Sequence, residues 1–245
     1  MKRLIRNLVR KLGYDIIRHI PNQMGKDPLY DMRTYLRSGS PVVFDVGANV
    51  GQSIQSFRSQ FPACSIHSFE PSPATFKILA QRTSDLKDVR LWNCALGSVS
   101  GKMRFLENSQ SEMSSFLPLS ELGWGEVTRE TLVEVRTIDQ FCDDEHIDYI
   151  DILKSDTQGF ELEVFKGAER TIRANRIGLI YFEIIFSDMY KNLPSFGDVY
   201  EFLTLHGFRL VSFYEFHYQR RLASWTDALF VHESYNRASR EEPRE

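Results

Sequence analysis

The sequence has little of several features that would point to particular classes of protein. Its three cysteines, Cys64, Cys94 and Cys142, have neither the spacing of a zinc site nor the number of a disulfide framework. It has no run of about 18 apolar residues, which argues against a transmembrane helix, and its N-terminus lacks the apolar core of a signal peptide. These absences favour a reducing, cytoplasmic location.

Nor does the sequence have a large excess of charge. The formal net charge is −3 over 245 residues, so there is no global case for nucleic-acid binding. With 42% hydrophobic residues the chain can bury a substantial core, and its length favours one domain. We place that domain at residues 38–233, after an N-terminal segment at residues 1–37. Residues 234–245 lose the apolar pattern and are expected to form a disordered tail.

The N-terminal segment begins with a basic, amphipathic stretch. Residues 1–20 hold six Lys or Arg and one Asp, with apolar residues at helical spacing. Such a helix can lie on an anionic membrane surface, which suggests peripheral association with the inner face of a membrane or with a glycan-assembly enzyme. In the alternative interpretation, the apolar stripe packs on the domain or on a second subunit of a homodimer.

The chain is organised around residues 41–51, PVVFDVGANVG, which predict a buried parallel strand, a turn and the start of a helix. Gly47 and Gly51 remove side chains where the backbone turns tightly and approaches a ligand. Asp45 ends the strand. Glu70 ends the next apolar run, 23 residues after Gly47, near the ~20-residue offset at which an acid reaches ribose hydroxyls.

Strands alternate with helices through residue 185 and are followed by a terminal strand pair. This order predicts a doubly wound, Rossmann-like α/β sheet that is mostly parallel with an antiparallel C-terminal edge. A polar insertion at residues 108–125 is a candidate substrate-facing loop. The expected strands cover residues 42–46, 64–69, 89–93, 102–106, 131–136, 147–153, 177–184, 208–216 and 227–232, and the expected helices residues 1–20, 31–37, 52–61, 74–83, 160–173 and 196–205.

The acids at the first turn indicate the kind of ligand. A pyrophosphate would be repelled by Asp45, which disfavours NAD. S-adenosylmethionine carries a sulfonium and an ammonium but no phosphate. Glu70 would accept hydrogen bonds from both ribose hydroxyls, and Asp45 would support the amino-acid end, with Asn49 within the turn.

Five patches of the sequence carry further information: FDVGANVG at 44–51, FEPSP at 69–73, NCALG at 93–97, RTIDQF at 136–141 and LKSDTQGFELEVFKGA at 153–168. Together they resemble the FkbM-type methyltransferases of the class I S-adenosylmethionine-dependent fold. The resemblance runs from about residue 42 to residue 231. It implies that the first two patches bind the cofactor, in agreement with the assignment of Asp45, Gly47, Asn49, Gly51 and Glu70.

The same patches add further candidate cofactor residues, which are Pro71, Asn93, Ala95 and Asp156. The chain departs from the family pattern at Ser155, where an aliphatic residue is usual, and at Gln158, where many members have Glu. Gln158 cannot act as a base, and we interpret it as the marker of a subtype.

Methyl transfer to a hydroxyl gains ~7–11 kcal/mol from alignment and roughly 10²–10⁴ in rate from a base. Asp156 is the first candidate for the catalytic position, and capping of the following helix is its alternative role. Glu183 ends the fifth parallel strand and needs a partner, which is a substrate hydroxyl, the cofactor or Arg209. His217 is a candidate base or a surface hydrogen-bonding residue. No His joins the two acids with ligand spacing, so no metal is assigned.

Other side chains near these positions keep two interpretations. Trp225 stacks on a sugar face or fills the sheet edge. Lys154 is expected to be solvated rather than paired with Asp156, and residues 113–115 to be solvated loop residues.

The resemblance implies an O-methyltransferase acting on a hydroxyl of a sugar, glycan or glycosylated metabolite. Two alternatives stay open, an adaptor that has lost its chemistry and a nicotinamide-dependent oxidoreductase.

Overall fold

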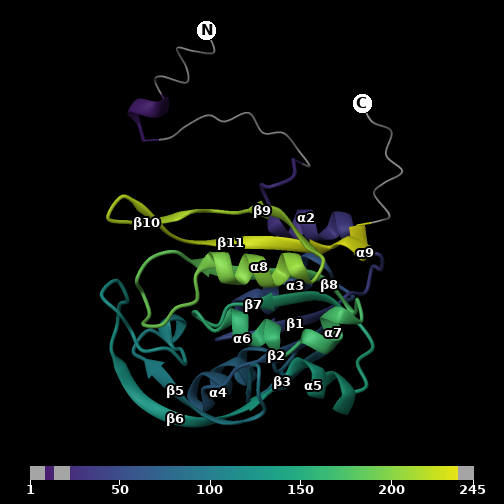
Figure 1. The fold of residues 1–245 in the computed structure, drawn as a ribbon, viewed down its shortest axis with the longest axis horizontal. Coiled ribbons are helices and arrows are strands. Elements are labelled where there is room, and N and C mark those ends of the chain that lie inside the picture. The colour runs from purple at the N-terminus through teal and green to yellow at the C-terminus, as the bar shows by residue number, and fades with distance from the viewer. Residues whose placement is uncertain (1–8, 14–22, 237–245) are drawn as a thin grey trace.

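The computed structural model describes residues 9–13 and 23–236 (Figure 1). Most of the helix expected at residues 1–20 therefore lies outside the described residues, as do residues 237–245 of the expected tail. Residues 9–11 are helical. No helix within the described ranges has the length and apolar character needed to cross a membrane.

An eight-stranded sheet forms the centre of the domain. Five strands run parallel in the order β3-β2-β1-β7-β8, and β11 then pairs antiparallel with β8 and with both β9 and β10. The predicted fold class, mostly parallel with an antiparallel C-terminal edge, is confirmed. The strands are β1 (Val42–Val46), β2 (Ser65–Phe69), β3 (Val89–Trp92), β7 (Ile150–Ser155), β8 (Ile177–Ile185), β9 (Phe208–Phe213), β10 (His217–Gln219) and β11 (Leu222–His232).

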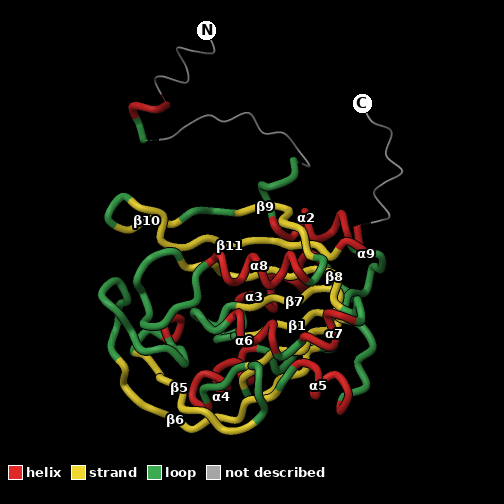
Figure 2. The backbone as a smooth tube through the Cα atoms, in the orientation of Figure 1, coloured by secondary structure: helices red, strands yellow, loops and turns green. Residues whose placement is uncertain are grey.

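Helices cover both faces of this sheet, as Figure 2 shows in red against yellow. Alternate residues of β1 divide the core, because successive side chains of a strand point to opposite faces. Phe44 and Val46 pack with one helical layer, and Val43 packs with the other. The first layer holds α5 (Ile138–Asp144), α6 (Glu161–Lys166), α7 (Glu169–Arg173) and α8 (Phe196–Leu205), and the second holds α2 (Pro28–Tyr35), α3 (Gln52–Gln60) and α4 (Pro73–Arg82).

The helix predicted over residues 160–173 is two short helices, α6 and α7. The break falls at Gly167, where a Cβ would lie 2.0 Å from the carbonyl oxygen of Gly97. This close approach of two backbone segments requires glycine and ends the helix. The apolar periodicity continues through the break, so the sequence alone predicted one helix.

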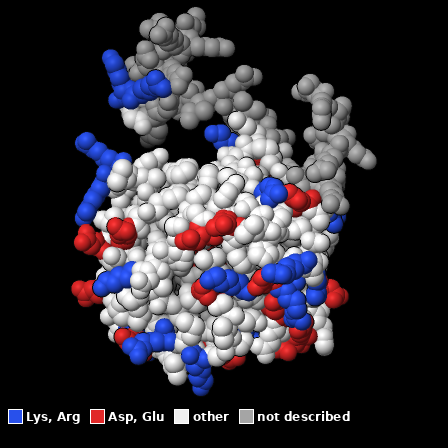
Figure 3. Space-filling view, in the orientation of Figure 1, with Lys and Arg blue, Asp and Glu red and all other residues white. Residues whose placement is uncertain are grey.

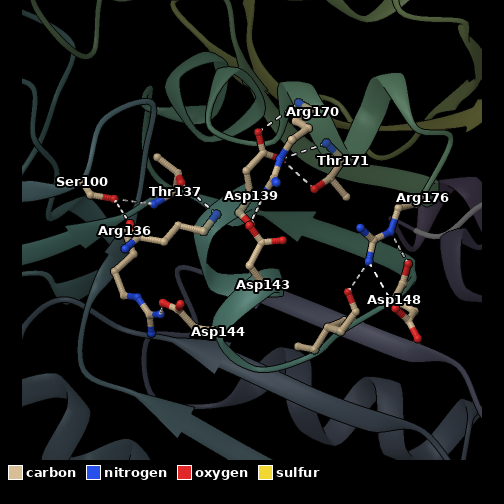
Figure 4. A network of polar contacts seen from close by, with 12 residues as sticks. Ser100, Arg136, Thr137, Asp139, Asp143, Asp144, Asp148, Arg170, Thr171 and Arg176 are labelled. Carbon is tan, nitrogen blue, oxygen red and sulfur yellow. Dashed lines mark hydrogen bonds and ion pairs between the residues drawn. The ribbon is translucent and has the colours of Figure 1, made fainter.

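A polar network ties α5 to α7 (Figure 4). The Asp139 carboxylate accepts hydrogen bonds from the backbone N–H of Arg170 at 2.9 Å and of Thr171 at 2.8 Å. The Arg170 guanidinium reaches Asp143 at 2.5 Å. Asp139 thus satisfies N–H groups of the first turn of α7, which have no partner within the helix. The α5 helix itself is capped by Thr137, whose hydroxyl accepts a hydrogen bond from Gln140 N at 3.1 Å.

A second sheet lies beside the first and covers one end of it (Figure 1). It has three strands in the order β4-β6-β5, which are β4 (Ala95–Leu96), β5 (Gly101–Asn108) and β6 (Val127–Arg136). The strands predicted at residues 102–106 and 131–136 exist, and they pair antiparallel with each other rather than joining the main sheet. The insertion between them folds back, with a bridge between Leu106 and Ser115.

Two expectations are wrong, one about the burial of the insertion and one about where the C-terminal tail begins. Met113 is 2% exposed and Ser115 1% exposed, so these residues of the insertion are buried rather than solvated. The tail expected from residue 234 begins too early, because α9 (Glu233–Asn236) is part of the domain. Its Tyr235 is buried, and the Tyr235 hydroxyl donates to Asp151 Oδ1 at 2.8 Å.

Charged side chains of both signs are interspersed on the face seen in Figure 3. Pairs such as Arg173 with Glu169 and Lys166 with Glu163 lie on the surfaces of α7 and α6. Mixed charge of this kind suits a solvated surface.

Candidate functional site

A pocket lies at the carboxyl ends of β1 and β2, with about 590 Å³ of empty space when the open solvent at its mouth is included. In open α/β sheets this edge, at the point where the strand order reverses, is where ligands bind. The order β2-β1-β7 places that point beside β1. The lining residues are Val46, Gly47, Asn49, Phe69, Glu70, Pro71, Ala95, Leu96, Phe105, Ser111, Glu112, Ser114, Phe116, Asp156, Thr157 and Gln158.

The floor of the pocket is the turn after β1. Gly47 N and Ala48 N both donate to Phe69 O at 3.0 Å, and Asp156 N donates to Val46 O at 3.0 Å. Gly47 has φ +77°, and a Cβ there would lie 1.9 Å from Asp156 O. The turn therefore packs directly on the segment after β7, which only glycine allows.

Glu70 lies in the pocket wall and is held by two backbone donors. Asn49 N donates to Glu70 Oε2 at 3.0 Å, and Ser72 N donates to Glu70 Oε1 at 2.9 Å. Burial raises the pKa of the Glu70 carboxyl to about 7, although the two N–H groups and the Lys154 ammonium act in the opposite direction. The carboxyl is fixed in position and retains lone pairs for a ligand.

The other predicted cofactor residues divide into two groups. Asn49 (φ +46°), Pro71 and Ala95 line the pocket with Glu70. Asn93 and Gly51 lie outside the pocket and support it. Asn93 donates through Nδ2 to Glu70 O at 2.8 Å and so holds the loop after β2.

Gly51 is the second of these supporting residues, because it lies outside the pocket. At φ +94° it precedes α3, and a Cβ there would lie 3.0 Å from Leu79 Cδ1. The left-handed backbone conformation favours glycine at position 51, which lies outside the pocket lining, so the prediction that Gly51 contacts the cofactor is corrected.

Asp45 is also placed away from the pocket, which corrects its assigned role at the amino-acid end of the cofactor. Val46 faces the pocket, so Asp45 faces the opposite side of the sheet and is fully buried. It forms an ion pair with Lys154 Nζ at 3.1 Å and accepts a hydrogen bond from Ser53 Oγ at 2.7 Å.

Lys154 was expected to be solvated, and this expectation is wrong. It is 8% exposed and donates to Gly47 O at 3.2 Å, with Asp156 Oδ2 at 3.6 Å. Burial lowers the pKa of Lys154, but the carboxylates Asp45 and Asp156 outweigh it and raise that pKa overall. The ammonium therefore stays charged beneath the pocket and links its turn to Asp156.

The structure brings Asp156 and Glu183 together, as the sequence predicted. Gln158 Nε2 donates to Asp156 Oδ1 at 3.0 Å and to Glu183 Oε2 at 2.7 Å. Gln158 is thus the protein partner that Glu183 needs, whereas Arg209 pairs with Glu233 at 2.5 Å. Asp156 caps no helix, because α6 has Phe160 as its N-cap and no side-chain cap.

His217 is not placed at this pocket, and its assignment as a base there is corrected. It lies on β10, three strand positions from β7 and hence roughly 14 Å away across the sheet. The His217 ring stacks on Trp225 at 4.6 Å with an interplanar angle of 5°. Trp225 also lies 5.7 Å from Trp124, which is 36% exposed. The three rings therefore form an aromatic cluster that joins β10 and β11 to the insertion at residues 108–125.

Sequence reasoning missed the residues that the second sheet and the insertion supply to the pocket. Phe105 and Phe116 contribute an apolar wall with ring centroids 5.1 Å apart, and Ser111, Glu112 and Ser114 contribute polar groups. The available signal was the position of the insertion after the NCALG patch, which indicated a covering loop but not these side chains.

The charge of the pocket selects among ligands. Among the described residues that line it are three acids, Glu70, Glu112 and Asp156, and no Lys or Arg. A phosphate or pyrophosphate is normally bound by cationic side chains or by free N–H groups at a helix N-terminus. Here acidic groups face the ligand instead, so the pocket suits a cationic ligand without phosphate.

Fold and pocket together define an α/β protein that binds a small ligand at the switch point of its sheet. The family model of the methyltransferase FkbM domain matches residues 45–210, and the chain belongs to this family. The predicted family and the predicted enzyme class, a methyltransferase, are confirmed.

Several relatives resemble the chain over parts of their length. The 2-O-methyltransferase NoeI of Sinorhizobium fredii is 26% identical over 68% of this chain and 76% of its own. The 31-O-demethyl-FK506 methyltransferase FkbM of Streptomyces tacrolimicus is 34% identical over 37% of each chain. The solved methyltransferase FkbM of Methylobacillus flagellatus has a TM-score of 0.56 at 18% identity, over 85% of this chain. This chain spans about half, 48%, of the length of that one, and the likeness shows the fold.

Proposed function

We propose that the protein is an S-adenosylmethionine-dependent O-methyltransferase that methylates a hydroxyl of a sugar, a glycan or a glycosylated metabolite. The observation that carries the proposal is the acidic pocket at the ends of β1 and β2, whose described lining has no cationic side chain. A nicotinamide cofactor, with its pyrophosphate, is disfavoured by the same observation.

The residues present fit this cofactor. Glu70 would accept hydrogen bonds from the ribose hydroxyls, and its carboxyl is already fixed by two N–H donors. Asn49 Oδ1 is buried and has no hydrogen-bond partner in the described part of the chain, so it is available to a donor such as an ammonium. Phe105, Phe116 and Leu96 supply apolar surface for an adenine ring.

Asp156 is the proposed general base. When bound, the cofactor supplies a methyl group on an activated sulfonium. Asp156 lines the pocket, and its side chain is 42% exposed, so an acceptor hydroxyl can reach it. Its carboxylate accepts the hydroxyl proton as the oxygen–methyl bond forms. Alignment of the two reactants in the pocket contributes the larger part of the acceleration, because it lowers the barrier by ~7–11 kcal/mol.

Oxygen is the proposed acceptor atom because two relatives, NoeI and the FK506 methyltransferase, are named for methylation of oxygen. A sugar is proposed because Trp124 of the insertion and Trp225 of β11 lie ring to ring at 5.7 Å, with Trp124 36% exposed. Aromatic rings with one exposed face stack on the apolar faces of sugars.

The function is tested by incubating the protein with isotope-labelled S-adenosylmethionine and a panel of glycans, and by measuring product masses. The expected product carries one labelled methyl group on oxygen. If the protein binds the cofactor, transfers to no hydroxyl, and its Asp156→Asn variant keeps full biological activity, an adaptor role replaces the proposed one.

Replacing Glu70 with glutamine is expected to weaken S-adenosylmethionine binding by about 10–100-fold. The amide keeps the shape of the side chain but loses the charge-assisted acceptor for the ribose, which is worth about 1.5–3 kcal/mol. Calorimetric titration measures the affinity. The matched control is Glu201→Gln, an exposed position on α8, which is expected to bind like the wild type. Equal affinities for the two variants would contradict the assignment of Glu70.

Cofactor affinity is also expected to fall as the pH is lowered from 7 to 5. Because the Glu70 carboxyl of the free protein has a pKa raised to about 7, it becomes protonated in this range. The bound state requires the carboxylate, so each pH unit below that value costs up to about tenfold in affinity. Titrations at several pH values test this. The slope should flatten in Glu70→Gln, and an unchanged slope would assign the titration to another group.

A further inference from the structure

The side chain of Gln158 occupies an unusual position between two acids. It is 9% exposed, and its backbone has φ +56°, a left-handed conformation that residues other than glycine adopt rarely. The two N–H bonds of Nε2 are directed at Asp156 Oδ1, 3.0 Å away, and Glu183 Oε2, 2.7 Å away. An amide nitrogen has two donors, so both are used.

The rest of Gln158 is held from the other side. The Tyr190 hydroxyl donates to Gln158 Oε1 at 2.8 Å, and the Ser115 hydroxyl donates to the backbone oxygen of Gln158 at 2.7 Å. Tyr190 is 3% exposed and packs on Met113. A flipped amide would direct its oxygen at the two carboxyl groups, so these acids favour the orientation in which Nε2 faces them and Oε1 accepts from Tyr190.

The acid pair lies among further ionisable groups. Burial, followed by the nearby charges of Asp156, Glu161 and Asp227, raises the pKa of Glu183 well above its usual range. Two ionised carboxyl groups that share one amide donor repel each other, which disfavours the ionised form of Glu183. Lys154 lies 3.6 Å from Asp156 Oδ2, which favours Asp156 as the ionised member.

The remaining groups around the pair favour the same assignment. Glu161 on α6 accepts from Thr157 N at 2.7 Å, and burial raises the pKa of Glu161 to about 7. Asp227 on β11 lies opposite Glu183 in the sheet and accepts from the Tyr181 hydroxyl at 2.7 Å. Acids thus surround Glu183 on several sides, whereas Asp156 has the ammonium and the opening to the pocket.

We propose that Gln158 is a positioning residue whose amide, held by Tyr190, joins Asp156, which lines the pocket, to Glu183 behind it as one acid pair. The proposal rests on the proposed methyl transfer. Gln158 takes no proton itself. It donates to Asp156 Oδ1 and so fixes the carboxylate at the wall of the pocket.

The role explains why an amide, rather than a carboxyl, suits position 158 in this chain. A carboxyl group in its place donates at most one hydrogen bond when protonated, and it adds a third negative charge when ionised. The protonated state therefore removes a donor from the acid pair, and the ionised state places a like charge beside it. A like charge nearby commonly raises a carboxyl pKa by about one unit or more. Below the raised pKa, the rate of a reaction that needs the carboxylate falls about tenfold for each pH unit.

The test compares the pH dependence of kcat/KM for the wild type, Gln158→Glu, Tyr190→Phe and the control Gln55→Glu, an exposed glutamine on α3. The acidic limb is expected to move to higher pH by about one unit in Gln158→Glu. It should move in the same direction, by less, in Tyr190→Phe, which keeps the ring and loses only the hydroxyl that orients the amide. Gln55→Glu should keep the wild-type limb.

A second readout needs no acceptor. Carbon-13 NMR of labelled Glu and Asp carboxyl groups follows the titration of Glu183 and Asp156 directly, and both titrations should move in Gln158→Glu and Tyr190→Phe. If they do not move, or if both variants lower kcat equally at every pH, Gln158 is only a structural residue and the inference is overturned. If wild-type protein methylates nothing while the NMR titrations move as expected, the acid pair stands and the proposed function fails.

Discussion

Replacing Asp156 with asparagine is expected to lower kcat for methyl transfer by roughly 10²–10⁴, the usual contribution of a general base. The amide cannot take the hydroxyl proton, but it keeps the size of the side chain and its contact with Gln158. Cofactor affinity should change much less than kcat, because Glu70 and Asn49 would still hold the ribose and the amino-acid end. Steady-state transfer of labelled methyl groups measures the first quantity and calorimetry the second.

The matched control is Asp85→Asn, an exposed aspartate outside the pocket, which should keep wild-type kcat. A kcat for Asp156→Asn within about threefold of wild type would remove Asp156 as the base and leave alignment alone to account for the rate. A loss of cofactor binding equal to the loss of kcat would instead assign Asp156 to cofactor binding.

Replacing Gly47 with alanine is expected to destabilise the protein by about 2–5 kcal/mol and to abolish the pocket. Two effects add. The residue has φ +77°, which an L side chain adopts only with strain, and the new Cβ would lie 1.9 Å from the backbone oxygen of Asp156. Because that contact is with backbone, the turn and the segment after β7 must separate. Urea unfolding measures the change in the free energy of unfolding.

Gly39→Ala is the control for this substitution. A Cβ at Gly39 meets no atom within 4 Å, so its free energy of unfolding should stay within about 0.5 kcal/mol of wild type. If Gly47→Ala were as stable as Gly39→Ala and bound the cofactor normally, the packing of the first turn on Asp156 would be wrong.

Local sequence pattern was sufficient for most of the scaffold. The run of β-branched and aromatic residues at β1, the glycines after it and the acid at Glu70 are signals within a few residues of one another, so β1, α3 and β2 were predicted close to their observed bounds. Glu70 and Asp156 were found because each directly follows an apolar strand, and Asn49 because it lies in the glycine turn after β1. In a parallel sheet such positions meet at one edge.

The errors arise where the answer depends on register between distant segments. Asp45 was assigned to the ligand from its proximity to the glycine turn, but it is directly paired in register with Lys154 of β7 on the opposite face. The alternation of Val46 and Asp45 was readable from the sequence, whereas the ion pair that neutralises Asp45 was not. His217 was likewise a plausible base until the order of β10, β11 and β8 separated it from Asp156.

The insertion shows a second limit. Its polar composition suggested a solvated loop, yet Met113 and Ser115 are buried because Tyr190 and Gln158 lie over them. Those contacts join residues that are 43 and 77 positions apart in the sequence. No local pattern encodes them, and the glutamine between the two acids therefore looked like a departure from a family pattern rather than a part of the site.

The central claim is that the pocket beside β1 binds a cationic, phosphate-free cofactor. Calorimetric titration of the purified protein with S-adenosylmethionine and, separately, with NAD tests it most directly. We expect one S-adenosylmethionine per chain with an affinity on the order of micromolar, typical of such sites, and no heat of binding with NAD. Binding of NAD without binding of S-adenosylmethionine would contradict the account.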